Sequence, residues 1–409
     1  MAAPVNFQIT FVEDGTVVAP QGFLAGATYA GLKTYAEDKL DLGIIFSEVA
    51  CVTAGVFTTN SIRSPSVTVC QEHLSQGPVR GLIVNAGIAN ACVGEQGYKD
   101  AKAMTAKAAK HLGLKPEDVL VCSTGIIGVE LPMSLINAGI DHIKVTDDGG
   151  HLLARAILTT DPKPKEIAVA FDLNGATVTL GGITKGAGMI HPNMATMLCF
   201  ITTDAEIQAD LLKGMLKAAA DESFNMMTID GDTSTNDTVL VLANGAAGAG
   251  PISEGSEGAD LFRKALGQVC VYLAKEIARD GEGASKLIEV TVEGAKTLQQ
   301  ARSAARTIAG SSLVKTAVHG NDPNWGRVVA ALGRSDAEVV EEKIALYIAS
   351  VCIMEDGRPI AFHKDSIIAI MSGPEVAFRI NLNLGDGRAT AWGCNLSEEY
   401  VTFNSAYTT

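Results

Sequence analysis

The 409-residue sequence lacks several features that would place it in common classes of protein. Its eight cysteines form no Cys-x-x-Cys pair, and no His and Cys residues cluster at the spacing of zinc ligands. Aromatic residues make up only 5% of the chain, and no apolar run reaches the ~18 residues of a membrane span. The net charge of −14 argues against nucleic acid or an anionic membrane as a partner. We therefore expect no metal, no nucleic acid and no membrane.

The start of the sequence also lacks the pattern of a secretory signal peptide. Together with the irregular spacing of the cysteines, this favours a reduced, cytoplasmic protein. Small apolar residues are abundant, and there are 42 glycines. Such a chain can bury a large core built from Ala, Val, Ile and Leu, and its length suits two or three domains of about 150 residues each.

Strands and helices alternate along the chain in a pattern typical of an α/β layer. The continuous apolar run at 81–85 predicts a strand buried on both faces. Helical spacing predicts helices at 98–114 and 259–279. Residues 169–182 alternate apolar and polar side chains around Asn174-Gly175, which predicts a hairpin.

Other segments carry weaker signals. We expect short strands at 67–70 and 399–403, and a helix followed by a strand over 303–318. The alternating runs 378–383 and 389–394 are joined by a Gly-Asp-Gly-Arg turn, which predicts a second hairpin.

The most unusual stretch is 185–200, Lys-Gly-Ala-Gly-Met-Ile-His-Pro-Asn-Met-Ala-Thr-Met-Leu-Cys-Phe. Its apolar end holds a single hydroxyl, Thr196, preceded by Ala195. One interpretation is a hairpin in which the strand threonine is hydrogen-bonded. The other is a nucleophile that attacks the carbonyl of Ala195 and cuts the chain there. The freed α-amine, with a pKa of about 7.7–8.0, could then act as the base for its own hydroxyl.

Three further candidates lie elsewhere in the chain. Thr124 and Gly125 follow a predicted strand, where a hydroxyl and backbone N–H groups could bind an oxyanion or simply form a glycine turn. Asp230 and Asp232 have a spacing that could hold Mg²⁺, or they could be a polar support near a site. Glu282 stands between two glycines and could be either a loop acid or a site carboxylate.

The stretch 185–200 resembles the self-cleavage segment of the ornithine acetyltransferase family, the glutamate N-acetyltransferases of arginine biosynthesis. Motifs at 119–128, 231–237 (Gly-Asp-Thr-Ser-Thr-Asn-Asp) and 320–327 (Gly-Asn-Asp-Pro-Asn-Trp-Gly-Arg) agree with that family in the same order. The resemblance implies an α/β fold of the ornithine acetyltransferase type, with mixed sheets layered with helices. It also implies self-cleavage into an α chain, 1–195, and a β chain, 196–409, which associate as an α₂β₂ heterotetramer.

The resemblance further implies the reaction and its residues. Acetyl would pass from N²-acetyl-L-ornithine to L-glutamate through an acetyl ester on Thr196, by a ping-pong mechanism. The oxyanion would be stabilised by Thr124 and Gly125. Substrate contacts would come from Thr159, Lys185, Thr196, Glu282, Asn404 and Thr409. No cofactor is implied, and whether acetyl-CoA is a second acetyl donor stays open, because family members with and without that activity share these motifs.

Three alternatives remain. The same threonine could serve an amidohydrolase or aminopeptidase, with water as the acceptor. Asp230 and Asp232 could serve a metal-dependent phosphotransferase. The third alternative is a binding protein without catalytic activity, which would stay uncleaved.

Overall fold

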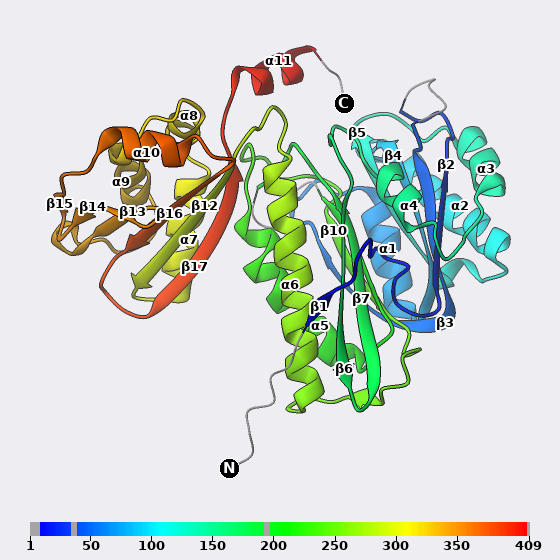
Figure 1. Ribbon diagram of the computed structural model, residues 1–409. Coiled ribbons are helices and arrows are strands. Elements are labelled where there is room, and N and C mark those ends of the chain that lie inside the picture. The colour runs from blue at the N-terminus through cyan, green and yellow to red at the C-terminus, as the bar shows by residue number, and fades with distance from the viewer. Residues whose placement is uncertain (1–8, 34–38, 192–196, 407–409) are drawn as a thin grey trace.

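The computed structural model describes residues 9–33, 39–191 and 197–406. Two units, each built on a β-sheet with helices packed against it, lie side by side (Figure 1). The predicted cleavage residues Ala195 and Thr196, and the predicted ligand contact Thr409, lie outside the described residues.

The first unit is a nine-stranded sheet in the order β1-β6-β7-β8-β10-β3-β4-β5, with β2 also paired to β3. Its strands are β1 (Thr10–Phe11), β2 (Phe23–Thr28), β3 (Leu42–Phe57), β4 (Val79–Ile88), β5 (Val119–Ile126), β6 (Lys165–Leu173), β7 (Ala176–Lys185), β8 (Leu198–Thr203) and β10 (Thr238–Ala243). The long strand β3 joins the two halves of this sheet. Its first half pairs with β2 and β4, and its second half pairs with β10.

Helices cover both halves of the sheet. They are α1 (Pro65–Gln76), α2 (Gly94–Leu112), α3 (Met133–His142), α4 (Gly150–Ala156), α5 (Ala209–Glu222) and α6 (Glu257–Arg279). The longest, α6, packs on β6 and β7 through buried residues that recur every three or four positions, such as Leu266, Val269 and Leu273. A short parallel pair, β9 (Glu206–Ile207) and β11 (Pro251–Ile252), lies apart from the sheet.

The second unit is a six-stranded sheet in the order β15-β14-β13-β16-β12-β17. Its strands are β12 (Leu287–Ala295), β13 (Ala345–Ile348), β14 (Val351–Glu355), β15 (Arg358–Pro359), β16 (Glu375–Asn381) and β17 (Gly387–Cys394). Its helices are α7 (Leu298–Ala309), α8 (Ser312–His319), α9 (Trp325–Gly333) and α10 (Lys364–Met371). Helix α7 packs across β12 and β17. The chain then forms α11 (Glu398–Ala406), which extends from this unit toward the first one (Figure 1).

The structure confirms the strand at 81–85 within β4, the helices α2 and α6, and the β6–β7 hairpin. Two predicted strands are wrong. Residues 67–70 belong to α1, which begins at Pro65. The side chain of Ser64 caps the N-terminus of this helix. Residues 399–403 belong to α11.

Two further predictions in the second half of the chain are also wrong. Helix α7 is followed by another helix, α8, and not by a strand. The predicted hairpin between β16 and β17 does not form, because β12 inserts between them, parallel to β16 and antiparallel to β17.

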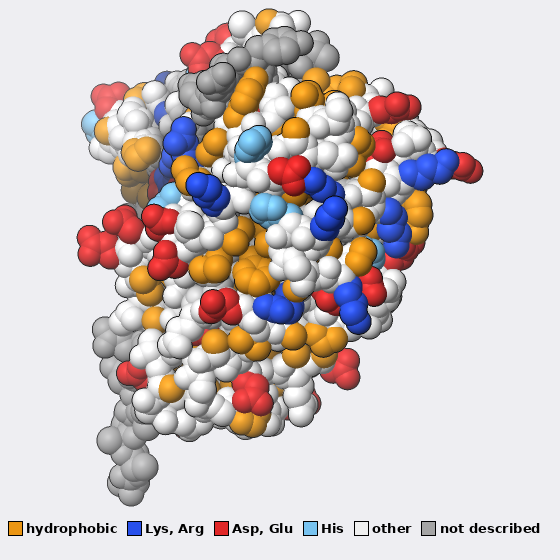
Figure 2. Space-filling model, turned by 90° about the vertical axis from the view of Figure 1, so that its right-hand side faces the viewer, with side chains coloured by type: hydrophobic (Ala, Val, Ile, Leu, Met, Phe, Trp, Pro, Cys, Tyr) orange, Lys and Arg blue, Asp and Glu red, His pale blue; other side chains and the backbone are white. Residues whose placement is uncertain are grey.

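Charges of both signs are interspersed with hydrophobic side chains on the face that forms the right-hand side of Figure 1 (Figure 2). The negative net charge is therefore not gathered into one large patch on this face. Within the described ranges, no helix combines the length and the apolar character needed to cross a lipid bilayer.

Candidate active site

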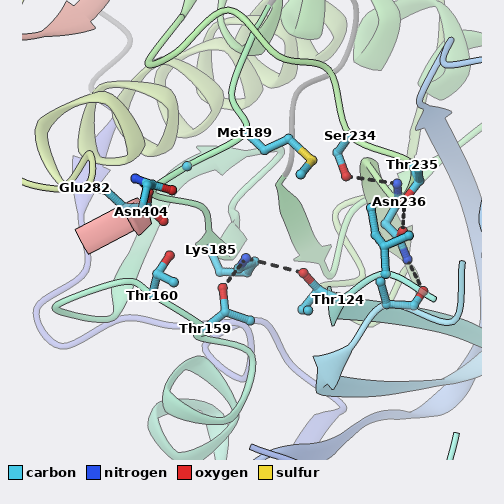
Figure 3. A pocket seen from close by; sticks show the side chains of 14 residues that line it. Thr124, Thr159, Thr160, Lys185, Met189, Ser234, Thr235, Asn236, Glu282 and Asn404 are labelled. Atoms are coloured by element: carbon cyan, nitrogen blue, oxygen red, sulfur yellow. Dashed lines mark hydrogen bonds between the residues drawn. The ribbon is translucent and has the colours of Figure 1, made fainter. Parts of the chain in front are cut away.

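A polar cavity of about 100 Å³ lies where the C-terminal ends of β5 and β7 meet the loops after α4, before β10 and after α6 (Figure 3). It brings together six of the predicted site residues from distant parts of the sequence. They are Thr124, Gly125, Thr159, Lys185, Glu282 and, from α11, Asn404.

Thr124 and Gly125 occupy the end of β5, beside the parallel strand β4. Gly125 has a φ of 130°, a backbone conformation that side chains other than glycine rarely adopt. A Cβ added there would lie 2.1 Å from the carbonyl carbon of Gly87 and 2.5 Å from the backbone nitrogen of Ile88. The glycine is therefore required by the close approach of the two strand ends, and it leaves the Thr124 hydroxyl and the neighbouring backbone at the cavity wall.

Lys185 is the last residue of β7, and its side chain is buried. Its Nζ donates to Oγ1 of Thr159 at 2.8 Å and to Oγ1 of Thr124 at 3.4 Å (Figure 3). Burial lowers the pKa of this lysine below its ordinary value, and Asp161 opposes that shift. An ammonium group with few protein partners is suited to bind a carboxylate of a small molecule.

Glu282 is held in the loop after α6 by its backbone N–H, which donates to the carbonyl of Ala187 at 2.9 Å. Its carboxylate lies against Gly188, where an added Cβ would come within 2.5 Å of Oε1. Oε2 accepts a hydrogen bond from Nδ2 of Asn404 at 2.8 Å. Asn404, although exposed, thus reaches the cavity from α11, at a position to which the resemblance assigns a ligand contact.

The sequence predicts the Gly-Asp-Thr-Ser-Thr-Asn-Asp motif at 231–237 only as a polar support near the site, and the structure shows which groups this segment holds. Asn236 is buried, and its Nδ2 donates to the carbonyls of Ala89 and Ser123 at 2.6 and 2.7 Å. The amide ties the loop before β10 to the end of β5. Asp237 is fully buried, and its Oδ1 accepts from the backbone N–H of Met197 at 3.0 Å. The loop therefore fixes the chain directly after the undescribed residues 192–196.

Asp230 and Asp232 do not form a metal site in the described part of the chain. The Asp230 carboxylate accepts hydrogen bonds from the backbone N–H groups of Met189, Ile190 and Asp232. Across residues 9–33, 39–191 and 197–406, no group of three or more His, Cys, Asp or Glu side chains could hold a metal ion. The role of Asp230 is to fix the backbone that leads to residue 192.

The fold and the cavity together define the class of protein: an α/β enzyme that acts on a small molecule, with a cavity that contains one lysine and one glutamate among its described lining residues. A model of the ArgJ family matches residues 24–409. The chain is 48% identical to a protein of Dehalococcoides mccartyi over 401 residues, covering 98% of this chain and 99% of that one. It is 49% identical to a protein of Symbiobacterium thermophilum over 397 residues, covering 97% and 99%. Both relatives are called arginine biosynthesis bifunctional protein ArgJ.

A crystal structure of the protein of that name from Bacillus halodurans is 44% identical, with a TM-score of 0.50. The match covers 98% of its chain but 51% of this one. The chain described here belongs to the ArgJ family.

Proposed function

We propose that this enzyme transfers an acetyl group from N²-acetyl-L-ornithine to L-glutamate, giving L-ornithine and N-acetyl-L-glutamate. The observation that carries the proposal is the cavity, where one lysine and one glutamate are the charged side chains among the described lining residues. N²-acetylornithine has one carboxylate and one ammonium group, so its charges match this pair. The names of the ArgJ relatives, which place them in arginine biosynthesis, agree with the proposal.

The proposed reaction begins with self-cleavage between Ala195 and Thr196. The Thr196 hydroxyl then attacks the acetyl carbonyl, and its own α-amine takes the hydroxyl proton. Thr124 and Gly125 stabilise the negative charge on the carbonyl oxygen. The proton passes to the departing ornithine nitrogen, which leaves an acetyl ester on Thr196. The amine of glutamate attacks this ester and releases N-acetylglutamate and the free threonine.

Substrate binding is assigned to the remaining residues. Lys185, supported by Thr159, would bind the α-carboxylate, and Glu282 would bind the side-chain ammonium of ornithine. Asn404 would orient the Glu282 carboxylate through the hydrogen bond to Oε2. Thr409, at the end of the chain, is assigned by the resemblance to the family.

The fold supports a cleaved enzyme whose two chains remain together. Strand β7 of the proposed α chain pairs with β8 of the β chain, and β3 pairs with β10, so both chains contribute to one sheet. The crystal chain from B. halodurans aligns with about half of this sequence, as expected if that relative is cleaved into two chains. We propose the α₂β₂ assembly and the cytoplasm as its setting, in keeping with the eight cysteines, all unpaired.

The decisive assay is release of L-ornithine from N²-acetyl-L-ornithine with and without L-glutamate. Release that depends on glutamate, together with an acetylated protein when glutamate is omitted, supports the proposal. Glutamate-independent hydrolysis would instead identify an amidohydrolase. Formation of N-acetylglutamate from acetyl-CoA and L-glutamate, with N²-acetyl-L-ornithine omitted, would add acetyl-CoA as a second donor, and no other cofactor is proposed.

A further inference from the structure

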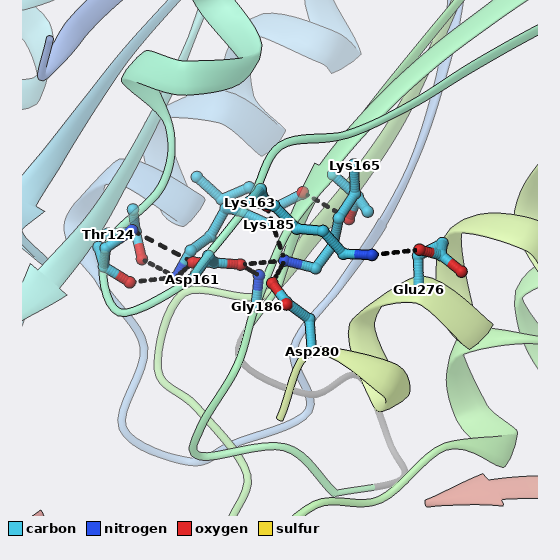
Figure 4. A network of polar contacts seen from close by, with 11 residues as sticks. Thr124, Asp161, Lys163, Lys165, Lys185, Gly186, Glu276 and Asp280 are labelled. Atoms are coloured by element: carbon cyan, nitrogen blue, oxygen red, sulfur yellow. Dashed lines mark hydrogen bonds and ion pairs between the residues drawn. The ribbon is translucent and has the colours of Figure 1, made fainter. Parts of the chain in front are cut away.

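Charged side chains of both signs form a buried network next to Lys185, which lines the cavity (Figure 4). Nζ of Lys165 donates to Oδ1 of Asp161 at 2.7 Å and to Oδ2 of Asp280 at 2.6 Å. The side chains of Lys165 and Asp161 are completely buried, and that of Asp280 is 8% exposed. Neither the sequence motifs nor the proposed reaction assigns a role to Lys165, Asp161 or Asp280.

The Asp161 carboxylate contacts three parts of the site at once. Its Oδ1 also accepts the backbone N–H of Gly186, the residue after Lys185. Its Oδ2 accepts the backbone N–H of Thr159 at 3.2 Å and lies 3.9 Å from Nζ of Lys185. One side chain therefore fixes the backbone next to Lys185, the backbone of the threonine that Lys185 contacts, and the ammonium group itself.

The charges of the network balance. Burial would raise the pKa of Asp161, but Lys165, Lys185 and the N–H of Gly186 hold that pKa below its usual range. Burial would lower the pKa of Lys165, but Asp161 and Asp280 raise it above its ordinary value. Lys165 is thus paired closely with both carboxylates, whereas Nζ of Lys185 lies 3.9 Å from Asp161 and donates to the hydroxyls of Thr159 and Thr124. Lys185 and Glu282 therefore remain the cation and the anion of the cavity wall that can meet the charges of a substrate.

We infer that Asp161 is a positioning residue that holds Lys185 and Thr159 in place for binding the substrate carboxylate, and that the Lys165–Asp280 ion pair keeps Asp161 charged. This inference rests on the proposed function, because it assigns Lys185 to the carboxylate of N²-acetylornithine. It also makes the site depend on a contact between the two proposed chains, since Asp280 follows residue 196 and Asp161 precedes it.

The charged groups that act on Lys185 come from several elements. Asp161 and Lys165 lie behind it, Glu282 lies in the loop after α6, and Asp237 precedes β10. Lys33, which follows β2, also interacts with Lys185 electrostatically. Asp161 is the strongest of the attractive partners. Removing its charge therefore makes Lys185 lose its proton at a lower pH.

The test compares Asp161→Asn with the wild-type cleaved enzyme from pH 6 to pH 10, with kcat and KM for N²-acetyl-L-ornithine measured at each pH. In Asp161→Asn, we expect the alkaline rise in KM to move about one to three pH units lower, the range that a neighbouring opposite charge produces. The value of kcat should change much less than KM. In Asp280→Asn, Lys165 keeps Asp161 as its partner, so the shift should have the same direction but be smaller.

The matched control is Asp260→Asn, which removes an exposed carboxylate paired with Arg263 near the far end of α6. Its pH profile should equal that of the wild type. Circular dichroism and thermal unfolding establish that each variant is folded, and Asp280→Asn replaces Asp161→Asn as the test if the latter does not fold. L-Ornithine binding by calorimetry over the same pH range gives a readout without turnover.

If the wild type is active and the folded variants show the same pH dependence of KM as the wild type, the inference is contradicted. It is also contradicted if the variants lose the same fraction of activity at every pH, because a purely structural role would produce that result. A wild type that neither acetylates glutamate nor binds ornithine contradicts the proposed function, and this inference with it. A shift in KM that is matched by a shift in ornithine affinity supports both.

Discussion

Replacing Gly125 by alanine should abolish most of the acetyl transfer without unfolding the protein. The added Cβ would lie 2.1 Å from the carbonyl carbon of Gly87, 2.4 Å from its oxygen and 2.5 Å from the nitrogen of Ile88. These are backbone atoms of β4, so the end of β5 must move to relieve the overlap. A φ of 130° adds strain of about 1–3 kcal/mol for a residue other than glycine.

The size of the effect follows from what moves. The displaced strand end carries the proposed oxyanion donors, and loss of one such donor typically lowers kcat by about 100- to 1000-fold, or about 2.7–4 kcal/mol. We therefore expect a fall in kcat of at least that order, with KM changed much less, because Lys185 and Glu282 lie on other elements. The assay is glutamate-dependent ornithine release by protein whose cleavage has been checked on a denaturing gel.

Gly128→Ala is the matched control. Gly128 also has a positive φ, 81°, but an added Cβ would meet no atom within 4 Å. It should lose about 1–2 kcal/mol of stability through backbone strain and keep its kcat. A Gly125→Ala enzyme with wild-type kcat, or a Gly128→Ala enzyme equally inactive, would refute the assignment of the oxyanion site.

Three other predictions test separate parts of the site. Glu282→Gln removes a charged hydrogen-bond partner worth about 1.5–3 kcal/mol, so KM for N²-acetylornithine should rise by about 10- to 100-fold. The control is Glu254→Gln, at an exposed position, which should leave KM unchanged. Equal KM values for the two variants would exclude Glu282 from binding. Burial raises the pKa of Asp237 well above its usual value, so the folded protein favours the protonated carboxyl. The stability that this group contributes is therefore complete below its pKa in the unfolded chain, about 3.9, and is lost as the pH rises. Asp237→Asn should therefore melt higher than the wild type at pH 8 and no higher at pH 4, and a lower melting temperature at pH 8 would contradict this reasoning. Activity should survive dialysis against EDTA, and its loss and recovery with Mg²⁺ would restore the metal-dependent alternative.

Local patterns predicted the fold well where they determine structure by themselves. The apolar strand in β4, the helical periodicity of α6 and the Asn174-Gly175 turn are confirmed because burial or turn chemistry acts within a few residues. The error at 67–70 arose because apolar β-branched residues outweighed the Ser64-Pro65 helix start. The false hairpin arose because nothing local reveals that β12, some 80 residues earlier, inserts between β16 and β17.

The site could be predicted only through the resemblance to a known family. Thr159 and Lys185 have ordinary local sequences, and only the fold brings them within 2.8 Å of each other. Asn236 and Asp161 carry no such local signal. Asn236 contacts carbonyls more than 100 residues away, and Asp161 contacts Lys185 and Gly186 only because the fold brings β7 beside it. The polar run that contains Asn236 indicated a functional segment, but the carbonyl groups that Asn236 binds are determined by the tertiary structure.

The central claim is that the chain cuts itself and that the freed threonine carries the acetyl group. Intact mass spectrometry of the purified, active protein tests it most directly. We predict two polypeptides, residues 1–195 and 196–409, with the second gaining one acetyl group on Thr196 after exposure to N²-acetylornithine alone. A single uncut polypeptide that transfers acetyl at the full rate would contradict it.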